Sequence, residues 1–211
     1  MLEKRQTYHH NDLKNELIEK GIELVNTEGL KSFSLRKVAA ACGVSHAAPY
    51  SHFQSKEELL NAMQNHITNE FSNMLKDTIN ACGDRPDILE HLGRAYVVFF
   101  MDKPHYFSFL HTQSNTRIDL SFNDDNSENY APFVIFKGLV ESLIAKADYP
   151  KARHKDTIIA LWAFIHGITS LATMTNVYYD EDWESKITDL LRVFNCPLFE
   201  ENQTEKVKGE R

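Results

Sequence analysis

Apolar residues in this chain recur mostly at steps of three and four, which is the repeat of one face of an α-helix. Only 8 of the 211 residues are glycine and only 6 are proline, so few positions break the repeat. The pattern therefore predicts an all-α fold. The expected helices span about residues 12–27, 35–42, 55–82, 85–101, 104–112, 131–149, 153–178 and 183–195, with a long polar loop at 112–130.

The segment from Ser34 to Leu59 has the sequence of two short helices that meet at a tight turn. Ser34 can cap the first helix, and Gly43 suits the left-handed backbone position that ends it. Ser45 can cap the second helix, which Pro49 keeps short because proline lacks a backbone N–H. A turn of this length is typical of helix-turn-helix units, whose second helix enters the major groove of DNA.

The distribution of charge supports contact with DNA, although the net formal charge is −7. Residues 29–56 include no acidic residue, whereas the chain average of 30 in 211 would place about four there. The same segment carries Arg36, Lys37 and Lys56, and also His46 and His52. A surface that lies against phosphates excludes carboxylates, because each would repel the charge of the nucleic-acid backbone.

This segment resembles the N-terminal domain of the TetR (tetracycline-repressor) family of bacterial transcriptional regulators. The resemblance rests on the Ala39–Ser45 turn (A-x-x-x-G-V-S), Tyr50, the His52-Phe53 pair, and Lys56 at the start of a long helix. A lysine in the first helical turn opposes the helix dipole, so a phosphate partner would account for Lys56. Tyr50 could instead be a core aromatic. The resemblance implies phosphate contacts from Ser34, Arg36, Tyr50, His52 and Lys56, with Lys37 beside them, and base contacts from Ser45, His46, Ala47 and Pro49.

A second resemblance concerns the stretch Leu161–Ala172, which is similar to the Trp-x-x-x-His-Gly motif of one C-terminal domain type in the same family. It implies a small-molecule site within a helical bundle and a homodimer formed by the last two long helices. Aromatic residues at helical spacing also suit a core, and His166 could be a satisfied core histidine. The candidate ligand-binding residues are Phe99, Phe107, Phe136, Trp162 and His166. The candidate dimer-interface residues are Ile158, Leu161, Ile165, Ile187, Leu190, Leu191 and Phe194.

The predicted architecture has a three-helix helix-turn-helix DNA-binding domain at residues 1–56. A long helix joins it to a larger helical ligand-binding and dimerisation domain at residues 57–200, followed by a disordered tail at 201–211. The expected partners are double-stranded DNA with a near-palindromic operator, a small-molecule effector that releases a repressor, and a second copy of the chain. No cofactor, metal or membrane is expected. The N-terminus lacks the apolar core of a secretory signal, which favours the cytoplasm.

Two other classes of protein are less consistent with the sequence. An enzyme is disfavoured because the chain contains no H-E-x-x-H, G-x-S-x-G, G-x-G-x-x-G or P-loop motif, and its three cysteines lack C-x-x-C spacing. A protein-interaction module that kept this fold but lost DNA binding is the second alternative. The absence of acidic residues at 29–56 argues against it, since such a protein would be free to gain carboxylates there.

Overall fold

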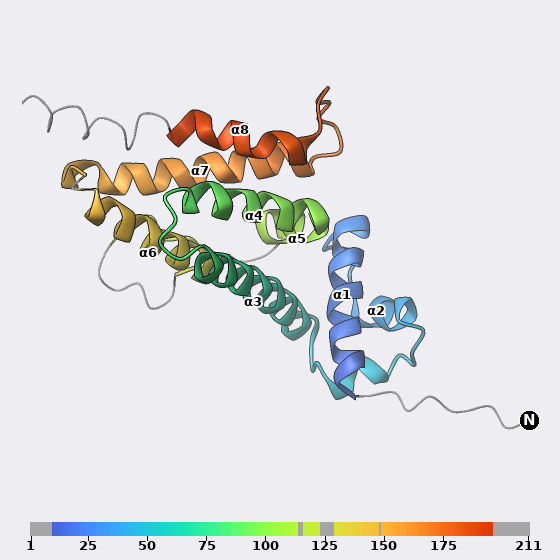
Figure 1. Cartoon of the computed structure of the whole chain (residues 1–211). Coiled ribbons are helices and arrows are strands. Elements are labelled where there is room, and N and C mark those ends of the chain that lie inside the picture. Colours follow the sequence, from blue (N-terminus) through green and yellow to red (C-terminus); the bar gives the residue numbers. More distant parts are fainter. Residues whose placement is uncertain (1–9, 114–115, 123–128, 148, 196–211) are drawn as a thin grey trace, which may run out of the picture. The chain divides into compact units, whose positions relative to one another are not determined.

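The computed structural model describes residues 10–113, 116–122, 129–147 and 149–195, and every regular element among them is helical (Figure 1). This confirms the predicted all-α fold, while the predicted tail at 201–211 lies outside the described residues. The α-helices are α1 (His10–Glu28), α2 (Leu35–Ala41), α3 (Lys56–Cys82), α4 (Ile88–Asp102), α5 (Pro104–Ser108), α6 (Ala131–Lys146), α7 (His154–Thr173) and α8 (Trp183–Asn195). Short 3₁₀ or π turns form η1 (Ala48–Ser51), η2 (Phe109–Gln113) and η3 (Lys151–Arg153).

The chain divides into two compact units. The first unit contains the residues up to Asn69 and the segment His105–Thr116. The second unit contains residues 70–104 and the chain from Arg117 onward. Helix α3 therefore begins in the first unit and ends in the second. The predicted domain boundary at residue 56 stays a prediction, because it falls where this shared helix begins.

The first unit has a core built on α1 and the first half of α3. Leu17 and Ile22 are at most 1% exposed, and Phe53, which was predicted to be core, is 2% exposed. A Cβ atom at Gly21 would lie 2.9 Å from the Met63 sulfur, so the Met63 side chain of α3 packs directly against α1 at this point.

The second unit is a bundle in which α4 contacts α7 and α8, and α6 contacts α7. Leu92, Tyr96 and Phe100 are buried at steps of four, so they form one face of α4. A Cβ atom at Gly93 would lie 2.9 Å from both terminal methyl carbons of Leu191. A side chain at position 93 would therefore require Leu191 to shift where α4 crosses α8.

Helix α7, with the turn before it, is the one described helix that is long and apolar enough to cross a membrane. Part of its apolar surface packs inside the second unit. The Trp162 ring lies 5.5 Å from the Tyr96 ring of α4 and 5.3 Å from the Phe133 ring of α6, centroid to centroid. Composition alone therefore does not indicate a membrane span here.

The structure corrects the prediction of a helix that begins at Ser45. Residues 45–47 form a turn, and the helix that follows is the single 3₁₀ turn η1. Ala48 N–H donates to the Ser45 carbonyl and Tyr50 N–H to the Ala47 carbonyl, which are the three-residue steps of a 3₁₀ helix. Pro49 lies in the first turn of η1, where its missing N–H would be unpaired in any case.

Candidate nucleic-acid interface

Hydrogen bonds fix both ends of α2, the helix that leads into the turn before η1. The Ser34 hydroxyl caps the helix by accepting a backbone N–H three residues later, at 3.4 Å. At the other end, the N–H groups of Gly43 and Val44 donate to the carbonyls of Ala40 and Ala39 at 3.1 and 3.0 Å. Gly43 has a φ of 67°, which is the left-handed conformation predicted for it. These bonds fix the direction in which the chain leaves α2.

Most of the predicted DNA-contacting residues lie at the surface of the first unit. Tyr50 is 55% exposed, so it is not a core aromatic. Pro49 is the exception, because it is buried within the chain. Its contact with a base stays a prediction. The exposed residues are Arg36, Lys37, Ser45, His46, Ala47 and Tyr50, and the half-buried ones are Ser34, His52 and Lys56.

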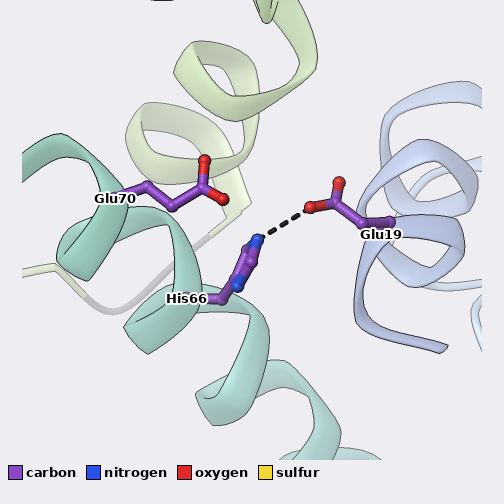
Figure 2. A group of neighbouring side chains, drawn as sticks. All are labelled: Glu19, His66 and Glu70. Carbon is purple, nitrogen blue, oxygen red and sulfur yellow. Dashed lines mark hydrogen bonds and ion pairs between the residues drawn. The ribbon is translucent and has the colours of Figure 1, made fainter. Parts of the chain in front are cut away.

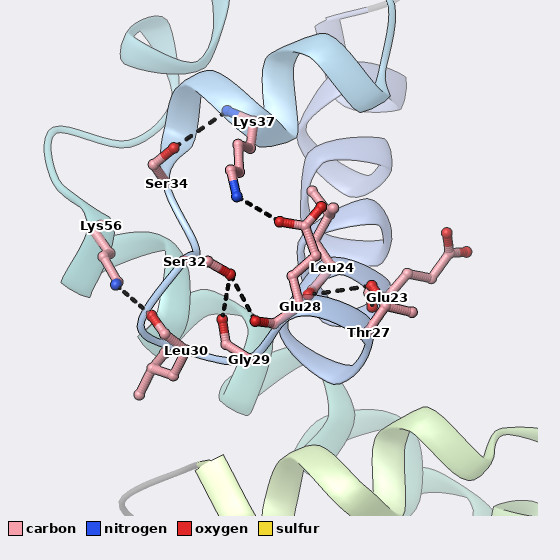
Figure 3. Close-up of polar contacts among 10 residues, drawn as sticks. All are labelled: Glu23, Leu24, Thr27, Glu28, Gly29, Leu30, Ser32, Ser34, Lys37 and Lys56. Atoms are coloured by element: carbon pink, nitrogen blue, oxygen red, sulfur yellow. Dashed lines mark hydrogen bonds and ion pairs between the residues drawn. The ribbon is translucent and has the colours of Figure 1, made fainter.

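Lys56 has a partner within the first unit. Its ammonium donates to the Leu30 carbonyl at 2.7 Å and lies 5.7 Å from the centre of the Phe33 ring (Figure 3). The loop between α1 and α2 therefore supplies the oxygen that a phosphate was expected to supply. A contact with DNA would use the other N–H groups of the same ammonium.

The two basic residues of α2 differ in their partners. Lys37 reaches back to α1, where its ammonium lies 2.5 Å from a carboxylate oxygen of Glu28 (Figure 3). Arg36 is exposed and takes part in no ion pair among the residues that the structure describes. Arg36 is thus the stronger candidate for a phosphate contact, because its charge is not already balanced by a carboxylate.

A polar network in the first unit was not foreseen from the sequence. The Tyr106 hydroxyl donates to Glu19 Oε1 at 2.5 Å. His66 Nε2 lies 2.7 Å from the same oxygen (Figure 2). A further contact joins Asn26 to His105 Nδ1 at 2.6 Å. Together these contacts attach the segment His105–Thr116 to α1. Since the partners are 40 or more positions apart, no local sequence signal could have identified them.

The predicted ligand-binding residues are divided between the two units. Phe136 and Trp162 are buried in the second unit with ring centroids 5.2 Å apart. His166 Nδ1 lies 3.2 Å from the Tyr96 hydroxyl, and burial lowers the pKa of His166. Phe99 is half-buried on α4. These four predicted residues belong to one aromatic cluster or lie beside it.

Phe107, the fifth predicted ligand-binding residue, lies in the first unit. It is 8% exposed, and its ring centroid is 4.5 Å from that of His111. Its place in the core of that unit gives it a structural role. The aromatic pattern alone could not separate it from the other four, because helical spacing does not reveal which body of the fold a helix joins.

Most of the residues predicted to form the dimer interface are buried within the single chain. Five of the seven residues are at most 5% exposed within the single chain, Leu190 is half-buried, and the side chain of Phe194 lies outside the described residues. The buried five are Ile158, Leu161, Ile165, Ile187 and Leu191. The outward face of α7 instead presents Ala160, Ala163, Gly167 and Leu171. Periodicity locates an apolar face but does not say which chain covers it.

A surface groove between α3 and α6 was also missed by the sequence analysis. It has a volume of about 490 Å³ and opens to solvent. Its lining combines aliphatic and polar side chains from both helices. They are Lys76, Ile79 and Asn80 of α3, and Ile135, Leu139 and Ser142 of α6.

A short helix-turn-helix with exposed basic and polar side chains, followed by a separate helical unit, defines a DNA-binding transcriptional regulator. Two family models match the chain. "Bacterial regulatory proteins, tetR family" matches residues 17–63, and "Tetracyclin repressor-like, C-terminal domain" matches residues 89–193. The chain belongs to the TetR family. The Trp-x-x-x-His-Gly subtype remains a prediction, because neither description names it.

Solved structures share the fold over most of the chain. A protein of unknown function from Rhodococcus sp. RHA1 is 22% identical with a TM-score of 0.69, covering 93% of this chain and all of that one. NalD of Pseudomonas aeruginosa, described as the secondary repressor of the MexAB-OprM multidrug efflux pump, is 22% identical with a TM-score of 0.65, covering 91% and 98%. A tetR-family regulatory protein from Rhodococcus RHA1 is 17% identical with a TM-score of 0.64, covering 88% and 96%. A comparison with curated proteins gives no significant match.

Proposed function

We propose that this protein is a cytoplasmic, homodimeric repressor that binds a near-palindromic operator and leaves it when a small molecule binds the second unit. The observation that carries the proposal is the surface formed by α2 and η1. It exposes cationic, hydroxyl and imidazole groups, and residues 29–56 contribute no carboxylate to it. NalD, which has a similar fold, is described as a repressor. This supports repression, and not activation, as the role of this protein.

On the DNA, Arg36 and Tyr50 would contact phosphates, and Ser45 and His46 would reach base edges. His46 is the one exposed side chain of the turn at residues 45–47 with ring nitrogens that can donate or accept at a base. Two such surfaces in a symmetric dimer would occupy successive major grooves about 34–36 Å apart. Phosphate contacts would supply affinity, and the few base contacts would supply sequence preference.

A second copy of the chain would pack on the outward face of α7. Ala160, Ala163 and Gly167 are exposed small residues at helical spacing, and Leu171 is 48% exposed on the same face. At Gly167, a Cβ atom would meet no atom within 4 Å among the described residues. Small side chains let two helices approach closely, so this face suits the four-helix interface that the family implies better than the buried residues do.

The test is a binding measurement with the purified protein. Operator-like duplexes are first selected from a random pool, and fluorescence anisotropy then compares them with scrambled duplexes at several salt concentrations. We expect selective binding that weakens as salt rises. Failure to select any sequence would leave the interaction-module alternative and refute the repressor.

The predicted effect of Arg36→Ala is weaker binding to every duplex, with the salt slope reduced by about 1, as expected when one phosphate contact is lost. The matched control is Lys146→Ala, which removes a cation of the second unit that is paired with Asp84. The control should keep the wild-type affinity and slope. An unchanged slope for Arg36→Ala would remove that residue from the DNA-binding surface.

A further inference from the structure

We propose that the groove between α3 and α6 binds a small amphipathic carboxylate, such as an alkyl carboxylate, and that this compound is the effector. The proposal that the groove binds such a compound depends only on the residues that line the groove. The role as effector rests on the proposed function. None of the residues predicted from the sequence to bind ligand lines this groove.

The shape of the groove suits an elongated apolar occupant. Its volume of about 490 Å³ lies within the range of about 300–1,000 Å³ that is typical of small-molecule sites. Its α6 wall runs from Ile135 to Ser142, which corresponds to about 10 Å at the rise of an α-helix. The aliphatic side chains of Ile79, Ile135 and Leu139 are half-buried along it. An alkyl chain laid against them would cover their exposed surface.

The charge of the groove favours an anionic head group. Lys76 is its one charged lining residue, and it takes part in no ion pair among the described residues. Two other lysines of the second unit differ in this respect, since Lys103 is paired with Glu70 and Lys146 with Asp84. No lining residue is acidic. A carboxylate beside Lys76 would gain a charge-assisted contact, and a cationic head group would be repelled.

The groove also offers an amide group. Asn80 lies on α3, one turn after Lys76, and lines the groove with it. Its side-chain NH₂ can donate hydrogen bonds. A head group that accepts hydrogen bonds would therefore find a second donor beside the Lys76 ammonium.

The experiment uses three probes with the same alkyl chain: decanoate, decanol and decyltrimethylammonium. Each is titrated below its micelle concentration into the full-length protein by calorimetry. We expect saturable binding of decanoate, at least tenfold tighter than that of decyltrimethylammonium. Equal affinity for the cation, or no binding of decanoate, would overturn the proposal.

Variants then locate the site. Lys76→Gln should weaken decanoate binding at least tenfold and leave decanol unchanged, while the control Lys146→Gln should leave both unchanged. An unaltered decanoate affinity in Lys76→Gln would place the ligand elsewhere. Leu139→Gln should weaken decanoate and decanol alike, and a circular dichroism melt verifies that each variant is folded.

Operator binding is measured separately in the same samples, so the two proposals fail independently. Selective DNA binding without decanoate binding would reject the groove and keep the repressor. Decanoate binding that leaves the operator affinity unchanged would keep the site and reject its role as effector. Release of the operator by decanoate but not by decyltrimethylammonium is the expected result.

Discussion

At the scale of single residues, Lys56 combines an observed structural contact with a predicted contact to DNA. Its ammonium bonds to the Leu30 carbonyl, so Lys56→Gln should lower the free energy of unfolding by about 1 kcal/mol, the usual net value of one hydrogen bond. Urea denaturation measures this. Lys31→Gln is the control, because Lys31 is exposed in the same segment and should change stability little. If the two variants were equally stable, the Leu30 contact would contribute nothing.

The pH dependence of stability should depend on His166. Burial lowers its pKa in the folded protein, whereas in the unfolded chain it titrates near the ordinary value of about 6.5. As the pH falls through 6.5, the unfolded state therefore gains a proton that the folded state does not, and stability decreases. Above that value His166 has no such effect.

The measurement is a pair of denaturation curves at about pH 7.5 and pH 5.5. Wild type should lose more stability between them than His166→Gln, which cannot take up this proton. The comparison with the variant cancels the titration of the other groups. Equal losses in the two proteins would show that His166 is not buried as described.

At the scale of secondary-structure elements, the crossing of α4 and α8 sets a sharp limit on side-chain size. Gly93→Ala places a methyl group against Leu191 in a packed core, which should cost about 1–3 kcal/mol and exceed the gain in helix propensity. Gly138→Ala is the matched control on α6, where nothing lies within 4 Å. It should stabilise the protein by up to about 1 kcal/mol. Thermal melts of both variants decide the point.

The sequence predicts the ends of helices best at residues with one main structural role, such as capping a helix or adopting a positive φ. Ser34 and Gly43 marked the two ends of α2, because helix caps and left-handed turns depend on local chemistry. The helix that follows Gly43 was harder to predict. The predicted helix from Ser45 shortened to η1, because one proline decides how many hydrogen bonds such a short helix can form.

The predicted functional residues divide in the same way. Arg36, His46 and Tyr50 were placed at the surface by motif and charge, and the structure exposes all three. Residues assigned to an interface from the family resemblance and their apolar spacing, such as Ile158 and Leu191, are buried within the chain. An apolar stripe has the same pattern whether its own chain or a partner covers it. The groove at Lys76 had no motif and needed the structure.

At the scale of the whole molecule, the proposed dimer predicts different effects for substitutions at two exposed glycines, Gly167 of α7 and Gly138 of α6. Gly167→Gln should weaken or abolish dimerisation, because a long side chain would stand between the two α7 helices. Gly138→Gln, on the exposed face of α6, should leave the dimer intact. Sedimentation velocity over a range of protein concentrations measures both. A Gly167→Gln protein that remained fully dimeric would exclude this face of α7.

The segment His105–Thr116 has a consequence for how this protein could be cut or recombined. The first unit is not contiguous in sequence, since α1–α2 and the start of α3 share it with a piece that lies about 35 positions farther on. A fragment that ends at Asn69 would lack Tyr106 and Leu110, which are at most 4% exposed, and the hydrogen bond to Glu19. Exchanging DNA-binding heads between relatives would therefore require two grafts, because a single splice would expose apolar surface that this segment normally covers.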